Sequence, residues 1–249
     1  MSLSVIIPSR NLDNLISCIA AVRRHELNVR IIVVDDGLRA QFRGTLLGRL
    51  DTIPGVKPFV YARNCNLGIA ASGDDDVILL NDDALLQTPG GFTAMSDWAL
   101  RFPCGHEFSR IDEICWSTGK THREAPEGVA GRIVGPLTNC SGNPEQIAQA
   151  AGPVGVRRTS RALPFLCVFI PRRVIDAVGL LDERFTAYGF EDDDYCRRAR
   201  LAGVETLIYE GCFVDHLSLP STFRGAPGAP GDIREGQRIY REKWEAQSI

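Results

Sequence analysis

The chain has 249 residues, 44% hydrophobic and 24% charged, which is enough to bury the core of one large α/β domain. Its formal net charge of −3 argues against a surface built to bind nucleic acid. No apolar run approaches the ~20 residues that a membrane span requires, and the N-terminal run lacks the basic flank of a signal peptide. The eight cysteines are scattered and form no Cys-x-x-Cys motif. We therefore expect a reduced, cytoplasmic protein without a disulfide framework.

The N-terminal part of the chain alternates strand-like and helix-like patterns. Residues 3–8 and 29–34 are continuous apolar runs, and between them apolar side chains recur at helical spacing. Strand, helix and strand of these lengths form a βαβ unit, which predicts a mainly parallel sheet with right-handed crossovers. The same criteria predict a helix at 42–50, a strand at 56–61, a helix at 66–72, a strand at 76–80 and a helix at 91–102.

The pattern weakens between residues 103 and 161, where Gly, Pro and polar residues dominate. Only residues 132–134 suggest a strand there. Apolar runs then return, and proline and glycine mark the helix ends. The predicted elements are a strand at 163–170, a helix at 171–178, a helix at 191–202, a strand at 206–214 and a polar helix at 232–245, preceded by a flexible loop at 225–231.

Acidic residues follow two of the predicted strands, at Asp35-Asp36-Gly37 and at Asn81-Asp82-Asp83. Carboxylates at the carboxyl ends of strands face the crevice where open α/β sheets bind ligands. The first pair could accept hydrogen bonds from a ribose or a base, although a turn explains it better. The second could hold Mg²⁺ or Mn²⁺, because phosphate oxygens and water supply the remaining ligands of a nucleotide-bound metal. A turn or a helix cap explains it equally well.

A second acidic cluster, Glu191 to Asp194, begins a predicted helix directly after Tyr188-Gly189-Phe190. The helix macrodipole favours acids there, and the last two can pair with Arg197 and Arg198 four residues further on. Glu191 and Asp192 have no such explanation. A carboxylate beside an aromatic wall can have the raised pKa that a general base needs.

Basic residues give weaker signals. His216 follows the last predicted strand, and a histidine there is either structural or a metal ligand through its neutral imidazole. A solvated basic face explains most of five arginines better than a diphosphate or anionic-acceptor site does. These are Arg157, Arg158, Arg161, Arg172 and Arg173.

Taken in chain order, seven segments resemble the family 2 glycosyltransferases of GT-A fold. The resemblance spans roughly residues 4–216, with 103–161 poorly matched. The segments are Val5-Ile6-Ile7-Pro8-Ser9-Arg10-Asn11, Val33-Val34-Asp35-Asp36-Gly37, Asn66-Leu67-Gly68-Ile69-Ala70, Leu79-Leu80-Asn81-Asp82-Asp83, Gly179-Leu180-Leu181-Asp182-Glu183-Arg184-Phe185, Gly189-Phe190-Glu191-Asp192-Asp193-Asp194 and His216.

The resemblance implies a single α/β domain over residues 1–249, Rossmann-like, with a mainly parallel central sheet flanked by helices. Residues 1–90 would bind the nucleotide sugar, 91–162 would form a variable insertion, and 163–249 would bind the acceptor. Separately, the hinge-like Gly and Pro composition of the loop at 225–231 suggests the hypothesis that this loop and the helix after it close over the donor as a lid.

The resemblance also implies inverting hexosyl or rhamnosyl transfer from a nucleoside diphosphate sugar to an acceptor hydroxyl. Asp83 would ligate Mn²⁺ or Mg²⁺, and His216 stands where many GT-A enzymes place a third metal ligand. Asn81 stands where the wider group often has Asp. Asp192 would be the base, as in the similar acidic motif of the β-1,4-galactosyltransferases, and Glu191 would hold acceptor or donor sugar. Asp82 would face the ribose or sugar, and the nucleotide would be lined by Pro8, Arg10, Asp36 and Arg63.

Several alternatives stay open at this point. A UDP sugar is the default donor and thymidine diphosphate rhamnose an alternative, while the acceptor could be a glycan, a protein, a metabolite or a modified nucleobase. A nucleotidyltransferase would normally show a Gly-rich phosphate loop and a lysine where this chain has Ser9-Arg10-Asn11. A non-catalytic binding module would bind the donor without turnover.

Overall fold

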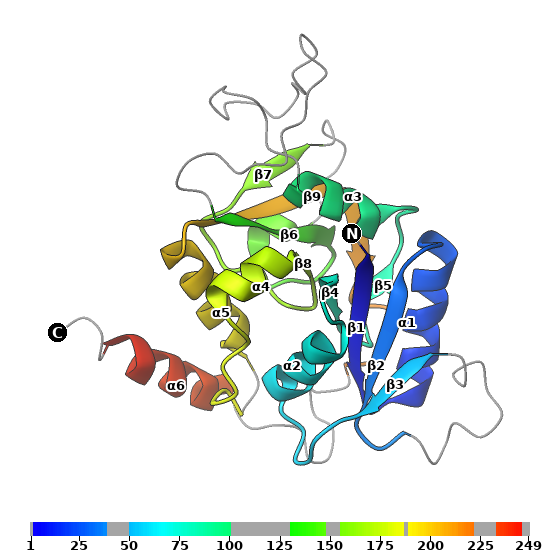
Figure 1. Ribbon diagram of the computed structural model, residues 1–249, viewed down its shortest axis with the longest axis horizontal. Helices are drawn as coiled ribbons and strands as arrows, with labels where there is room; N and C mark the ends of the chain where they lie inside the picture. The colour runs from blue at the N-terminus through cyan, green and yellow to red at the C-terminus, as the bar shows by residue number, and fades with distance from the viewer. Residues whose placement is uncertain are drawn as a thin grey trace, which may run out of the picture.

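The computed structural model describes residues 2–38, 50–100, 130–147, 155–186, 189–221 and 233–245. Within them, nine strands form one mixed sheet in the order β3-β2-β1-β4-β8-β6-β9-β5, with β7 paired to β9, and helices pack against it (Figure 1). The predicted α/β class is therefore confirmed.

The N-terminal half of the sheet is parallel, as its βαβ pattern predicted. β1 (Leu3–Ser9) lies between β2 (Arg30–Asp35) and β4 (Asp76–Leu80), and β3 (Asp51–Pro54) forms the edge beside β2. α1 (Leu12–His25) makes the crossover from β1 to β2, and the Asn11 side chain caps its first turn. This order places the carboxyl ends of β1, β2 and β4 at one edge.

The predicted strand at 56–61 is wrong. The edge strand is β3, and α2 (Tyr61–Ala71) already begins where the predicted strand would end. Pro58 interrupts the apolar run and has no amide proton for a strand ladder. Phe59 and Val60 are buried as the approach to α2 instead. The predicted helix at 42–50 falls almost entirely outside the described residues.

The C-terminal half of the sheet mixes strand directions. β8 (Cys167–Ile170) runs antiparallel to β4, and β6 (Gly131–Thr138) and β9 (Val204–Asp215) run parallel to each other. β5 (Leu85–Leu86) and β7 (Val156–Arg158) are both antiparallel to β9. Periodicity finds strands but not their direction, so the mixed half could not be read from the sequence.

Two apolar layers hold the helices to the sheet. Successive residues of a strand face opposite sides, so Val5 and Ile7 of β1 pack with α1 and α3 (Gly91–Leu100), whereas Ile6 packs with the other layer. That second layer joins the sheet to α2, α4 (Arg172–Val178) and α5 (Glu191–Leu201). Both faces are therefore covered. No helix among the described residues is long and apolar enough to cross a membrane.

The last helix, α6 (Ile233–Glu245), is fixed to α5 through the buried carboxylate of Asp194. Asp194 accepts hydrogen bonds from Arg198 Nε at 2.9 Å and Trp244 Nε1 at 3.0 Å, and Lys243 Nζ lies 2.6 Å from its Oδ1. Lys243 also reaches Asp182 at 2.8 Å. The loop proposed as a lid hinge lies outside the described residues.

We expect Asp194→Ala to lower the free energy of unfolding by about 2–4 kcal/mol, because two cations and an indole N–H lose a buried partner. Urea unfolding would measure it. Glu235→Ala is the matched control, since it removes an exposed carboxylate whose ion pair among the described residues is with Arg238 of the same helix. Equal, small effects of both changes would show that Asp194 does not anchor α6.

Candidate active site

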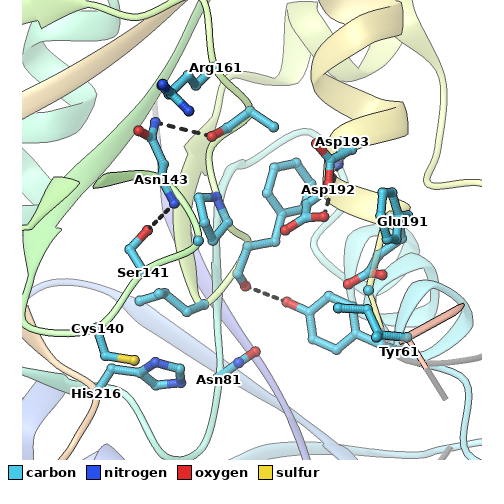
Figure 2. Close-up of a pocket in the computed structure, with 18 of the residues that line it drawn as sticks. Tyr61, Asn81, Cys140, Ser141, Asn143, Arg161, Glu191, Asp192, Asp193 and His216 are labelled. Atoms are coloured by element: carbon cyan, nitrogen blue, oxygen red, sulfur yellow. Dashed lines mark hydrogen bonds between the residues drawn. The ribbon is translucent and has the colours of Figure 1, made fainter. Parts of the chain in front are cut away.

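A cavity of about 640 Å³ opens at the carboxyl end of β4 and brings together residues from distant parts of the chain (Figure 2). Its wall includes Asn81 after β4, Tyr61 of α2, the first residues of α5, and His216 after β9. The second acidic cluster and the histidine that the sequence singled out therefore line one cavity, while the first cluster contributes Asn81 to its wall and Asp83 behind His216. In Figure 2, Asn81, His216 and Cys140 lie at one end, and Arg161 and Asp193 at the other.

Asp83 and His216 are brought together by the pairing of β5 with β9. Leu85 pairs antiparallel with Asp215, so the residues just outside each strand face one another. Asp83 Oδ1 lies 3.2 Å from His216 Nε2, and the Asp83 side chain is 3% exposed. Yet Asp83 Oδ1 and His216 Nδ1 are buried without a hydrogen-bond partner among the described residues, as is Asn81 Oδ1. Unsatisfied buried acceptors are costly and call for a missing partner.

These residues fit a divalent cation that carries other ligands with it. No group of three His, Cys, Asp or Glu side chains in the described ranges is arranged to hold a metal. A carboxylate and an imidazole would thus provide two ligands, and a nucleotide diphosphate and water would provide the rest. This arrangement differs from a structural metal site, in which protein side chains supply all the ligands.

Asp82 lies beside this pair and is held by the first strand. It is fully buried, and Ser9 Oγ at the end of β1 donates a hydrogen bond of 2.5 Å to its Oδ2. The neighbouring turn residue Asp35 has the role that turn chemistry predicted, since its Oδ1 accepts the backbone N–H groups of Gly37 and Leu38.

The residues predicted to line the nucleotide do not line this cavity. Pro8 and Asp36 lie at the paired ends of β1 and β2, and Lys57 Nζ is 3.6 Å from Asp36 Oδ1. Burial raises the pKa of Asp36, although Lys57 and Arg10 oppose the rise. Arg63 instead donates to Glu183 at 3.2 Å. A nucleotide that reached both Asp36 and the cavity would lie across the ends of β1 and β4.

The carboxylates of Glu191 and Asp192 face the cavity from the first turn of α5 (Figure 2). They are aimed by a left-handed turn, with φ of 86° at Gly189 and 74° at Phe190. A phenylalanine at positive φ is strained, and such strain gathers at functional sites. Tyr188, which was also expected here, lies outside the described residues.

Desolvation dominates the acid–base behaviour of these carboxyls. Burial, and then the charge of Asp193, raises the pKa of Asp192 to about 7. Burial, and then Asp192, raises the pKa of Glu191 well above its usual range. A carboxyl with a pKa near neutrality suits proton transfer at physiological pH.

Only one of the two predicted ion pairs of α5 forms as expected. Asp194 pairs with Arg198, whereas Arg197 lies over the Trp244 ring at 4.1 Å. Burial raises the pKa of Asp193, and the positive charge of Arg200 counteracts that rise. An i,i+4 spacing permits a pair but cannot foresee a tertiary partner such as Trp244.

Sequence reasoning missed several cavity residues. Arg200 and Tyr61 carried no motif, and Cys140, Ser141 and Asn143 lie in the weakly patterned middle of the chain. Of the five arginines considered, only Arg161 lines the cavity. The others bond elsewhere: Arg157 to Glu210, Arg158 to Glu205, Arg172 to Ser72 and Arg173 to the Ala99 carbonyl.

Comparison with known proteins gives one curated relative and clear structural neighbours, while no protein-family model matches the chain. "Uncharacterized protein y4gI" of Sinorhizobium fredii is 27% identical over 215 residues, which cover 80% of this chain and 23% of that protein. The chain thus spans less than a quarter of this relative.

Two solved structures share the fold. One is GalNAc-T7 with UDP, GalNAc and Mn²⁺, at a TM-score of 0.63 and 12% identity, covering 98% of this chain and 48% of that one. The other is the mannosyltransferase PcManGT of Pyrobaculum calidifontis with GDP-Man and Mn²⁺, at 0.60 and 13%, covering 90% and 58%. The chain spans about half the length of these proteins. Its fold is that of the GT-A-type glycosyltransferases.

The raised pKa of Asp192 predicts a pH-dependent cost to stability. Between about pH 4 and 7 the folded protein keeps a proton that the unfolded chain releases, so the free energy of unfolding falls as pH rises through that window. Asp192→Asn removes the cost. We expect it to stabilise the protein by about 1–2 kcal/mol at pH 8, discounted for partial solvent exposure, and by much less at pH 4.5. Urea unfolding at both pH values tests this, and an equal change at both would contradict it.

Proposed function

We propose that this protein is a metal-dependent, inverting glycosyltransferase that moves a hexosyl or rhamnosyl group from a nucleoside diphosphate sugar to an acceptor hydroxyl. One observation carries the proposal. Asn81 and His216, whose side chains each have a buried polar atom without a hydrogen-bond partner among the described residues, line the same cavity as the carboxylate of Asp192, and buried Asp83 lies beside them. The Mn²⁺ named for both structural neighbours supports it, as do the UDP and GalNAc named for one and the GDP-Man named for the other.

In this proposal, residues 1–90 bind the donor. Asp83 and His216 hold Mn²⁺ or Mg²⁺, which when bound neutralises charge on the leaving nucleoside diphosphate. Pro8, Arg10, Asp36 and Arg63 would bind the nucleotide, and Arg63 would first have to give up its exposed pair with Glu183, which costs little. Asp82, held by Ser9, would receive a ribose or sugar hydroxyl. A UDP sugar is the donor we favour.

Asp192 is the proposed base. Its carboxylate would take the proton of the acceptor hydroxyl while that oxygen attacks the anomeric carbon from the side opposite the leaving diphosphate, which inverts the configuration. Glu191 would accept a hydrogen bond from the acceptor or donor sugar. Aromatic cavity residues, including Phe165 and Phe190, offer apolar walls for sugar rings. The acceptor half then comprises residues 163–249 together with the loop after β6 from the predicted insertion.

We also propose that the protein resides in the cytoplasm. The six described cysteines are free, and five of them are buried. This is the usage expected in a reducing compartment such as the cytoplasm.

Donor binding tests the proposal first. We expect UDP to raise the melting temperature only with Mn²⁺ present, because a ligand that binds the native state stabilises it by about 2.7 kcal/mol at a hundred times its Kd. Asp83→Ala should lose the response, whereas Asp13→Ala, which removes an exposed carboxylate from α1, should keep it. GDP and thymidine diphosphate are tested in the same way, because they are the leaving groups of the alternative donors. A response that Asp83→Ala retains, or no Mn²⁺-dependent response to any of the three, would refute the metal–nucleotide site.

Turnover tests the role of Asp192. We expect Asp192→Asn to bind Mn²⁺ and nucleotide normally but to lose transfer by about 10²–10⁴-fold. In the wild type, kcat/KM should rise with pH towards a plateau above about 7, as Asp192 ionises. Release of pyrophosphate from a nucleoside triphosphate would identify a nucleotidyltransferase instead. Donor binding without transfer or hydrolysis across a broad acceptor panel would identify a binding module.

A further inference from the structure

We infer that Asn139 is a positioning residue that holds His216 in place for the metal. The inference rests on the proposed function, since it assumes that His216 is a metal ligand. Asn139 follows β6 in the part of the chain where the sequence pattern is weakest, and no motif pointed to it.

The side chain of Asn139 makes two hydrogen bonds, and both go to the end of β9. Its Nδ2 donates to Asp215 Oδ1 at 2.8 Å, and its Oδ1 accepts the backbone N–H of His216, also at 2.8 Å. Both lengths are near the optimum for such bonds. The amide therefore clips the residue that carries the imidazole and the residue before it.

The strand ladder explains why a side chain is needed at this point. β6 and β9 pair up to Thr138 and Val214, after a register shift between Pro136 and Leu137, and the backbone ladder ends there. On the other side of β9, the pairing with β5 ends at Leu85 and Asp215. His216 thus lies two residues beyond the ladder with β6 and one residue beyond the ladder with β5. Beyond the last backbone pair with β6, the side chain of Asn139 accepts the backbone N–H of His216 in place of a backbone carbonyl.

The turn after β9 depends on the same contact. Asp215 Oδ1 also accepts the backbone N–H groups of Leu217 and Ser218, which reverses the chain directly after His216. Asn139 therefore holds both the backbone of His216 and the carboxylate that shapes its turn. On the imidazole itself, Nδ1 makes no hydrogen bond within the described chain, and Nε2 lies 3.2 Å from Asp83 Oδ1, the other proposed metal ligand. We therefore expect the backbone contacts of His216 to contribute to holding the imidazole near Asp83.

The consequence is a specific loss of metal affinity when Asn139 is truncated. Partners that orient a metal ligand typically change metal affinity by about 10–100-fold when removed. We expect Asn139→Ala to raise the Kd for Mn²⁺ alone by about 10-fold, measured from the free Mn²⁺ signal in electron paramagnetic resonance. Asn66→Ala is the matched control. Asn66 is a buried asparagine that, like Asn139, joins two distant segments through two hydrogen bonds, here with both backbone groups of Leu181, and it does not line the cavity. It should lower stability without changing the Kd.

A double-mutant cycle shows whether Asn139 acts through His216. If it does, Asn139→Ala will raise the Kd in the wild-type background but cause no further rise in the His216→Ala background. Equal effects in both backgrounds, or a Kd unchanged by Asn139→Ala, would overturn the inference. If the alanine variant does not fold, Asn139→Asp replaces it, because aspartate keeps the size and the acceptor for the His216 N–H but loses the donor to Asp215. The Kd of Asn139→Asp for Mn²⁺ must then also rise.

The same data separate this inference from the proposed function. A wild-type protein that binds Mn²⁺, with the Kd unchanged by Asn139→Ala, overturns the role of Asn139 and leaves the metal site standing. A wild-type protein that shows no Mn²⁺ binding and no Mn²⁺-dependent response to UDP overturns both.

Discussion

The short antiparallel pairing of β5 with β9 is the constraint on which the candidate site depends. Only two residue pairs form it, Leu85 with Asp215 and Leu86 with Val214. They place a carboxylate from the N-terminal half next to an imidazole from the C-terminal half, far apart in the sequence. Because strand register fixes which residues meet, a shift of β9 by one position would turn each of its side chains to the other face. The proposed metal site of Asp83 and His216 follows from this register, and the role of Asn139 follows from the separate pairing of β6 with β9.

The base side of the cavity depends on a second, separate piece of structure. The left-handed turn at Gly189 and Phe190 starts α5, and buried Asp194 ties α5 to α6. Tyr240 of α6 lies against Phe190, with ring centroids 5.7 Å apart, and Ile233 reaches the cavity wall. The helix predicted as part of a lid is thus also a support for the turn that presents Asp192.

The sequence revealed the parts of this arrangement that rest on local pattern. β1, β2 and β4 are continuous apolar runs, and the acids that follow β2 and β4 are found where ligand-binding acids of an α/β sheet belong. Pro58 misled the reading of residues 56–61, since hydrophobicity alone does not register a missing N–H. The antiparallel direction of β8 and the pair between Asn139 and His216 are tertiary facts without a local signature. Cavity residues such as Cys140 and Arg200 could not be predicted from the sequence, because their place in the cavity wall also depends on tertiary contacts.

Anomalous diffraction at the manganese absorption edge, from crystals grown with Mn²⁺ and UDP, would locate the metal. We expect one strong peak within ligand distance of both Asp83 and His216, about 2.0–2.3 Å, with the diphosphate on its far side and the base towards Asp36. A peak elsewhere, or UDP bound with no manganese between its phosphates and Asp83, would contradict it.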